Sequence, residues 1–106
     1  MSLPDILTRY FDAANRFDIH DASDCFTSVA FVHDEERDHA GREAIRAWIE
    51  ETTLKYHSQF EMMHFDAHGN EIQVTAKVSG DFPGSPINLQ FNFILRDGKI
   101  DKLTIR

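Results

Sequence analysis

Two side chains in the first third of the sequence could carry proton chemistry if the fold brings them together. Tyr10 falls within an apolar helical pattern, and Asp34 ends an apolar run that is typical of a strand. A carboxylate in an apolar hollow is a better base because water no longer solvates it, and a phenol stabilises an oxyanion without carrying a charge. The pair would suit removal of a proton next to a carbonyl. The alternatives are a core tyrosine with a satisfied hydroxyl and an acid in a solvated turn.

The helix that carries Tyr10 is predicted to start near Pro4 and to run to about Arg16. Proline fits the first helical turn, and an acid such as Asp5 is favoured at the positive end of the helix dipole. Tyr10 belongs to the apolar stripe of this helix and is therefore expected to point inward. The stripe comprises Leu3, Ile6, Leu7, Tyr10, Phe11, Ala14 and Phe17.

A short second helix is expected after Asp18, because Asp18 followed by Asp21 has the pattern of an N-cap with an acidic first turn. Its apolar face comprises Ile19, Ala22, Cys25 and Phe26. Cys25 is the only cysteine and cannot form an internal disulfide, so we expect it to act as buried packing.

The strand that ends at Asp34 is predicted to begin at Val29, because its residues are β-branched and aromatic. Successive side chains of a strand point to opposite faces, so His33 and Asp34 do not both line one cavity. We expect Asp34 to face inward. The acidic run over residues 34–38 is interpreted as a solvated loop. A third helix should follow Gly41, with a stripe of Ala44, Ile45, Trp48, Ile49 and Thr52.

The second half of the sequence alternates apolar and polar residues, which predicts antiparallel strands. Turns are expected at residues 68–70 and at Asp97-Gly98, and a break at residues 80–86. The predicted strands cover residues 56–65, 72–78, 87–95 and 100–105. Helices followed by an antiparallel sheet indicate an α+β fold.

Length and charge restrict the function classes. A chain of 106 residues is expected to form a single domain over residues 1–106. A formal net charge of −7, with no basic stripe, argues against a nucleic-acid partner. The first residues lack the pattern of a signal peptide, and no apolar stretch reaches the length of a membrane span. We therefore expect a soluble, cytoplasmic protein without a membrane partner.

The six histidines show no spacing typical of metal ligands, so neither a metal site nor a cofactor is predicted. Aromatic residues are numerous enough to form the wall of an apolar cavity, although a packed core would use the same residues. The predicted lining comprises Phe26, Trp48, Phe60, Phe82, Phe91 and Phe93.

The order of elements and several short motifs resemble the nuclear-transport-factor-2-like (NTF2-like) superfamily, in particular its SnoaL-like and ketosteroid-isomerase-like members. The resemblance covers nearly the full length. It rests on Arg9-Tyr10, Asp18-Ile19, Asp34, residues 41–45, residues 80–86 and residues 97–103. It implies a cone in which three helices from the N-terminal half pack on a strongly curved, mostly antiparallel sheet and enclose a pocket.

The resemblance also implies roles for the two candidate residues. Asp34 corresponds to the acid that shuttles a proton on carbon, and Tyr10 to the donor for the enolate oxygen. This chain departs from the isomerases at their second donor, whose position falls near Phe91. The tyrosines that brace the reactive phenol are replaced by Phe26 and Ile49.

Three functions follow as hypotheses. The first is an isomerase or cyclase that acts on a small apolar or carbonyl-containing ligand. The second is a noncatalytic ligand-binding or dimerisation module, which the missing second donor favours. The third is a protein-interaction domain that uses the outer sheet face. The resemblance implies a homodimer.

Overall fold

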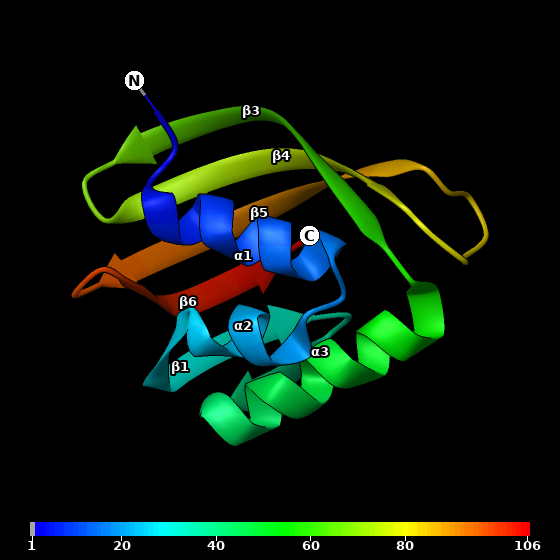
Figure 1. Cartoon of the computed structure of the whole chain (residues 1–106). Helices are drawn as coiled ribbons and strands as arrows, with labels where there is room; N and C mark the ends of the chain where they lie inside the picture. The colour runs from blue at the N-terminus through cyan, green and yellow to red at the C-terminus, as the bar shows by residue number, and fades with distance from the viewer. Residues whose placement is uncertain (1) are drawn as a thin grey trace.

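A single curved sheet forms the back of the molecule, and three helices cover its concave face (Figure 1). The computed structural model describes residues 2–106. The helices are α1 (Asp5–Asn15), α2 (Ile19–Asp24) and α3 (Arg42–Tyr56); the strands are β1 (Phe26–Asp34), β2 (Arg37–Ala40), β3 (Gln59–His68), β4 (Glu71–Ser79), β5 (Ile87–Arg96) and β6 (Lys99–Ile105).

The six strands have the order β2-β1-β6-β5-β4-β3, and only the β1–β6 pair is parallel. Alternation along the strands separates an apolar inner face from a polar outer face. On the inner face, Val74 lies opposite Phe91 and Ile72 opposite Phe93. The expected architecture, a mostly antiparallel curved sheet with three helices, is therefore confirmed.

The helices follow the predicted pattern closely. Pro4 is the N-cap of α1, and Leu7, Tyr10 and Phe11 form its buried face. The predicted cap of α2 is confirmed, because the Asp18 carboxylate accepts a hydrogen bond from the Asp21 backbone N–H at 3.0 Å. These short helices are held by tertiary packing, α2 mainly against α1 and α3, and α1 against α2 and the sheet, since isolated helices of this length are marginal in water.

Phe26 was placed wrongly in the second helix. Helix α2 ends at Asp24, with Cys25 as its C-cap, and Phe26 begins β1. Phe26 pairs with Ile100 of β6 and is fully buried. Strand pairing and complete burial of the phenyl ring override the helical spacing of the sequence.

The run after Asp34 is exposed, as predicted, but it forms a hairpin rather than a loop. Asp34 lies opposite Arg37, and Glu35 and Glu36 form a two-residue turn with φ values of 53° and 62°. Such a turn matches the twist of the strands even though Gly or Asn is preferred there. The charged residues of β2 are tolerated because β2 is a short, exposed edge strand.

The region around Tyr56 also differs from prediction, because α3 runs to Tyr56 and the next strand starts at Gln59. His57 is the left-handed C-cap of α3, and its backbone N–H donates to the Thr53 carbonyl at 2.9 Å. The side chain of Tyr56 therefore projects from the last turn of a helix rather than from a strand.

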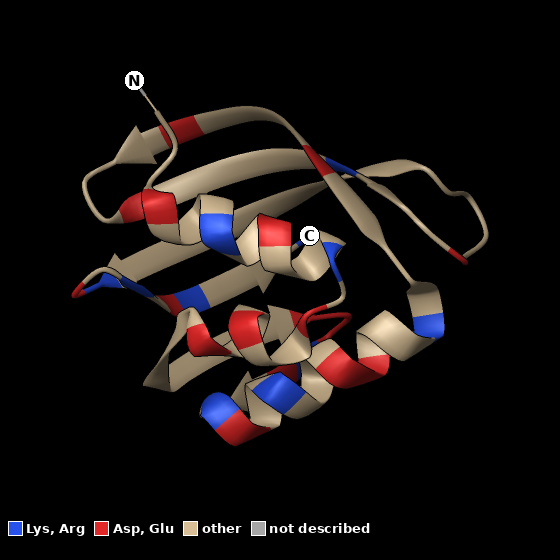
Figure 2. Cartoon of the chain, viewed as in Figure 1, with Lys and Arg blue, Asp and Glu red and all other residues tan. Residues whose placement is uncertain are grey.

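The surface charges are dispersed. Figure 2 shows acidic segments on all three helices, with Lys and Arg among them on α1 and α3. No helix within residues 2–106 combines the length and the hydropathy that a membrane span requires.

Candidate functional site

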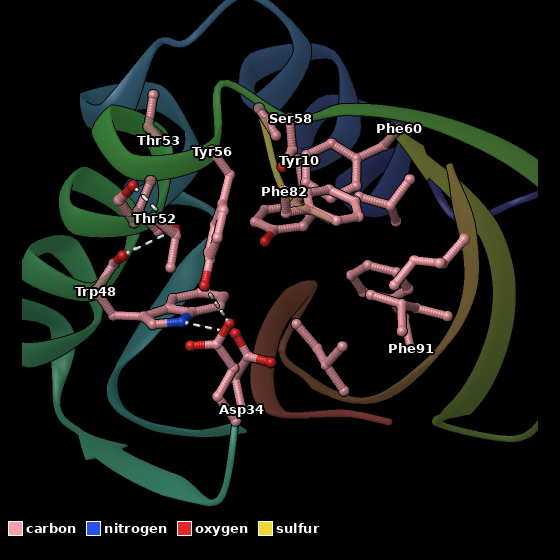
Figure 3. Close-up of a pocket in the computed structure, with 17 residues that line it drawn as sticks. Tyr10, Asp34, Trp48, Thr52, Thr53, Tyr56, Ser58, Phe60, Phe82 and Phe91 are labelled. Atoms are coloured by element: carbon pink, nitrogen blue, oxygen red, sulfur yellow. Dashed lines mark hydrogen bonds between the residues drawn. The ribbon is translucent and has the colours of Figure 1, made fainter. Parts of the chain in front are cut away.

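A cavity of about 220 Å³ lies between the concave face of the sheet and helices α1 and α3 (Figure 3). Its floor and walls are mostly hydrocarbon and aromatic rings, and its two carboxylates lie at the β1–β2 turn, where the Trp48 indole and the Tyr56 hydroxyl bind them. The lining comprises Tyr10, Ala14, Asp34, Glu35, Trp48, Ile49, Thr52, Thr53, Tyr56, Ser58, Phe60, Val78, Phe82, Ile87, Leu89, Phe91 and Ile105.

Asp34 is in the lining, at the end of β1. Its Oδ2 accepts a hydrogen bond from the indole Nε1–H of Trp48 at 3.1 Å. Burial raises the pKa of the Asp34 carboxyl above its ordinary value, the charge of Glu35 adds to the rise, and the Trp48 hydrogen bond opposes it. His33, the preceding residue, instead pairs with Asp38 on β2 at 2.6 Å. Asp34 is thus a partly buried carboxylate held in place by the Trp48 indole.

Tyr10 lies in the same lining, on α1. Its side chain is 4% exposed, and its ring packs edge-on against Phe11 and Phe26, with centroids 5.4 and 5.5 Å away. Within residues 2–106 the hydroxyl has no hydrogen-bond partner. Burial raises the pKa of the phenol, and the charge of Asp34 raises it further. The hydroxyl therefore stays protonated and remains free to donate to a ligand.

The aromatic residues predicted for the lining divide into two layers. Trp48, Phe60, Phe82 and Phe91 line the cavity. Phe26 and Phe93 do not, so their prediction as lining residues was wrong. Both are fully buried, and their ring centroids lie 5.5 and 6.0 Å from that of Tyr10. They form a second layer that supports the phenol from behind, because the Tyr10 ring occupies the space next to the cavity.

Glu35 and Tyr56 complete the polar end of the cavity. The resemblance implied that the segment of Glu35 rims the cavity mouth, but neither residue was singled out from the sequence. The Tyr56 hydroxyl donates to Glu35 Oε1 at 2.8 Å, and this bond connects the end of α3 to the β1–β2 turn (Figure 3). Trp48, Thr52 and Tyr56 are spaced by four residues and so share one face of α3. Extending the predicted stripe by one more turn would have found Tyr56.

The backbone of Tyr56 is held by the connection between β4 and β5. The backbone N–H of Asp81 donates to the Tyr56 carbonyl at 2.7 Å. Gly80 packs so closely that an added Cβ would lie 2.6 Å from the same carbonyl oxygen. Glycine at this position therefore allows α3 to end against the sheet with Tyr56 at the cavity.

The site offers a base and a neutral donor at one hydrophobic chamber. Phe91, where the isomerases place their second donor, contributes only a phenyl ring that is 1% exposed. Thr52 also lines the cavity, but its hydroxyl is already engaged, because it donates to the carbonyls of Trp48 and Ile49 at 2.9 and 3.2 Å. Within residues 2–106 no three His, Cys, Asp or Glu side chains are grouped as metal ligands would be.

Comparison with known proteins agrees with this architecture. The model of the SnoaL-like domain family matches residues 7–102. A proposed polyketide cyclase from Sinorhizobium meliloti is 38% identical, with a TM-score of 0.95 over 98% of this chain and 95% of that one. No curated protein is similar enough to count as a relative.

Two more distant structures show the same fold. An NTF2-like protein of unknown function from Cytophaga hutchinsonii has a TM-score of 0.82 and 16% identity over 96% of this chain and 86% of that one. A protein with a ketosteroid isomerase-like fold from Catenulispora acidiphila, solved in complex with trimethylamine, has a TM-score of 0.88 and 17% identity over 99% and 86%.

Proposed function

Because this chain belongs to the SnoaL-like domain family, we propose that it is a small-molecule isomerase or cyclase that acts by proton abstraction next to a carbonyl. In this proposal Asp34 takes the proton from carbon, and the Tyr10 hydroxyl donates a hydrogen bond to the carbonyl oxygen as it becomes an enolate. The proton then returns to another carbon, or the enolate carbon attacks an electrophilic carbon of the same molecule and closes a ring.

A single observation supports the proposal most directly: Asp34 and the unpartnered hydroxyl of Tyr10 line one apolar cavity. The raised pKa of Asp34 makes its carboxylate a stronger base than a solvated aspartate. The raised pKa of Tyr10 keeps the donor neutral at physiological pH. The cavity thus holds a neutral donor beside a carboxyl group whose affinity for a proton is raised.

The size of the cavity restricts the substrate. Sites for drug-sized ligands measure about 300–1,000 Å³, whereas this cavity measures about 220 Å³. A more open hollow of about 620 Å³ adjoins the cavity and shares Asp34 and Glu35 with it. We therefore propose that the carbonyl-bearing end of the substrate, which the cavity would hold, is compact.

The proposal is tested by the exchange of α-protons for deuterium in small conjugated enones and polyketide-like ketones, with proton NMR as the measurement. We expect Asp34→Asn to slow catalysed exchange by roughly 10²–10⁴-fold, the usual contribution of a positioned general base. Asn can still accept the Trp48 hydrogen bond, so folding and the affinity for neutral ketones should persist.

The pH dependence of exchange provides a second readout. Only ionised Asp34 acts as a base, and burial raises its pKa. As the pH falls, the exchange rate should therefore drop at a higher pH than it would if the base were an ordinary aspartate. A wild-type protein that binds ketones but exchanges no α-proton at any pH would contradict the catalytic proposal.

The alternative is a noncatalytic ligand-binding module of the same superfamily. The phenyl ring of Phe91 favours it, since the lining lacks the second donor of the isomerases at this position. In that case Asp34→Asn would leave ligand affinity unchanged, and the wild-type protein would show no exchange.

A further inference from the structure

We infer that the cavity selects a ligand with a positively charged amine next to its reactive carbonyl, an inference that rests on the proposed function. Within residues 2–106, the charged side chains of the lining are two carboxylates, those of Asp34 and Glu35, and the lining contains no Lys, Arg or His. A cleft with one sign of charge and low-dielectric walls attracts the opposite charge and repels its own. Carboxylate and phosphate ligands are therefore disfavoured.

Neither carboxylate has a cationic partner in the described part of the chain. Asp34 accepts from the Trp48 indole, and Glu35 accepts from the Tyr56 hydroxyl. Neither residue takes part in an ion pair. The Lys55 ammonium lies 5.0 Å from the centroid of the Tyr56 ring, outside the lining. The charge of Glu35 contributes to raising the pKa of Lys55, and the charge of His39 lowers that of Asp34, but neither carboxylate has an ion-pair partner within residues 2–106. A cationic ligand in the cavity would supply a direct partner.

His33 and Arg106 do not neutralise the cavity. They line an adjoining, more open hollow of about 620 Å³, which shares Asp34 and Glu35 with the cavity and also includes Glu36. The His33 ring is already paired with Asp38. The adjoining hollow is therefore of mixed charge, whereas the charged side chains that line the cavity are carboxylates.

The aromatic walls of the cavity favour a cationic ligand, as the two carboxylates do. Aromatic faces attract ammonium groups through the ring quadrupole, most strongly where water is excluded. The aromatic part of the lining comprises Tyr10, Trp48, Tyr56, Phe60, Phe82 and Phe91. The Tyr10 hydroxyl, unpartnered on a side chain that is 4% exposed, remains available for the carbonyl of the same ligand (Figure 3).

A bound cation would also assist the chemistry. Burial and the charge of Glu35 both raise the pKa of Asp34 and so favour its protonated, inactive form. A positive charge within about 4–6 Å favours the ionised form. A cationic substrate would thus shift Asp34 toward its basic form on binding, whereas a neutral ketone would not.

A matched pair of ketones tests the inference. The quaternary ammonium (2-oxopropyl)trimethylammonium and the neutral 4,4-dimethylpentan-2-one have nearly the same shape and differ in charge. Titration of each into the wild-type protein at low salt, followed by NMR, gives two dissociation constants. We expect the cation to bind about tenfold more tightly, from cation–π and charge attraction. Equal binding, tighter binding of the neutral ketone, or no binding of the cation would overturn the inference.

Two turn variants separate the site from the general surface charge. Glu35→Gln removes one lining charge but can still accept the Tyr56 hydrogen bond, and Glu36→Gln removes the neighbouring charge, which lies outside the lining. We expect Glu35→Gln to weaken binding of the cation about tenfold and that of the neutral ketone less than about twofold. Glu36→Gln should change both by less than about twofold. Equal effects of the two variants on the cation would overturn the assignment to this cavity.

The same probes distinguish failure of this inference from failure of the proposed function. Preferential binding of the cation without exchange of its α-protons, measured against the uncatalysed rate, would contradict the proposed catalysis and retain the charge preference. Catalysed exchange of the neutral ketone, with no preference for the cation, would support the proposed catalysis and overturn the charge preference.

Discussion

At the scale of single side chains, the hydroxyl of Tyr10 distinguishes this residue from an ordinary core tyrosine. Buried tyrosines usually satisfy their hydroxyl with a protein partner. The Tyr10 hydroxyl has none within residues 2–106, and its ring is clamped by Phe11, Phe26 and Phe93. Packing thus fixes the phenol, while its donor is left for a ligand.

Tyr10→Phe should therefore separate activity from stability. Removing an oxyanion donor lowers rates by about 10²–10³-fold, so we expect exchange to slow by about that factor. The free energy of unfolding should stay the same or rise slightly, because no hydrogen bond within the protein is lost. Thermal unfolding and the exchange assay measure the two effects. A clear loss of stability with unchanged exchange would assign Tyr10 to the core alone.

At the scale of secondary structure, the site depends on where α3 ends. Its last turn places Tyr56 at the cavity, and the β4–β5 connection packs against the Tyr56 carbonyl. The Glu35–Tyr56 hydrogen bond then joins α3 to the β1–β2 turn. Three segments that are distant in sequence meet at this point.

Gly80→Ala should disturb that junction. Its Cβ would lie 2.6 Å from a backbone oxygen, so the chain must shift. We expect a destabilisation of about 1–3 kcal/mol, the usual range for overpacking a well-packed site, together with a displacement of Tyr56. Denaturant unfolding gives the first quantity, and the chemical shifts of the Tyr56 ring report the second. Glu36→Gln, in a different turn, serves as a control, and wild-type stability of Gly80→Ala would contradict the tight contact.

At the scale of the whole molecule, the helices cover one face of the sheet and leave the other uncovered (Figure 1). The outer face presents uncharged polar side chains at its centre, among them Gln73, Thr75, Gln90 and Asn92. We propose that two copies associate through this face about a two-fold axis, the commonest symmetry of small assemblies.

Sedimentation equilibrium checks this proposal. A dimer should have twice the chain mass of 12.2 kDa, with a monomer fraction that grows on dilution. A mass of one chain at all concentrations would rule out the dimer. The cavity lies within a single chain, so the proposed chemistry does not depend on this outcome.

The sequence by itself determined the elements and the two candidate residues. Helical spacing placed Tyr10 on the inner stripe of α1, strict alternation defined β4 and β5, and an apolar run ended at Asp34. These features are local consequences of the helix and strand periods, which the chain encodes within a few residues.

Only the tertiary structure decided which side chains border empty space. Phe26 and Phe93 are as apolar as Phe60 and Phe91, yet the first two lie behind Tyr10 and the last two face the cavity. Glu35 and Tyr56 meet across 21 positions of sequence because of sheet curvature and the end of α3. A cavity is the volume that packed elements fail to fill, and no periodic pattern of residues encodes where that volume will lie.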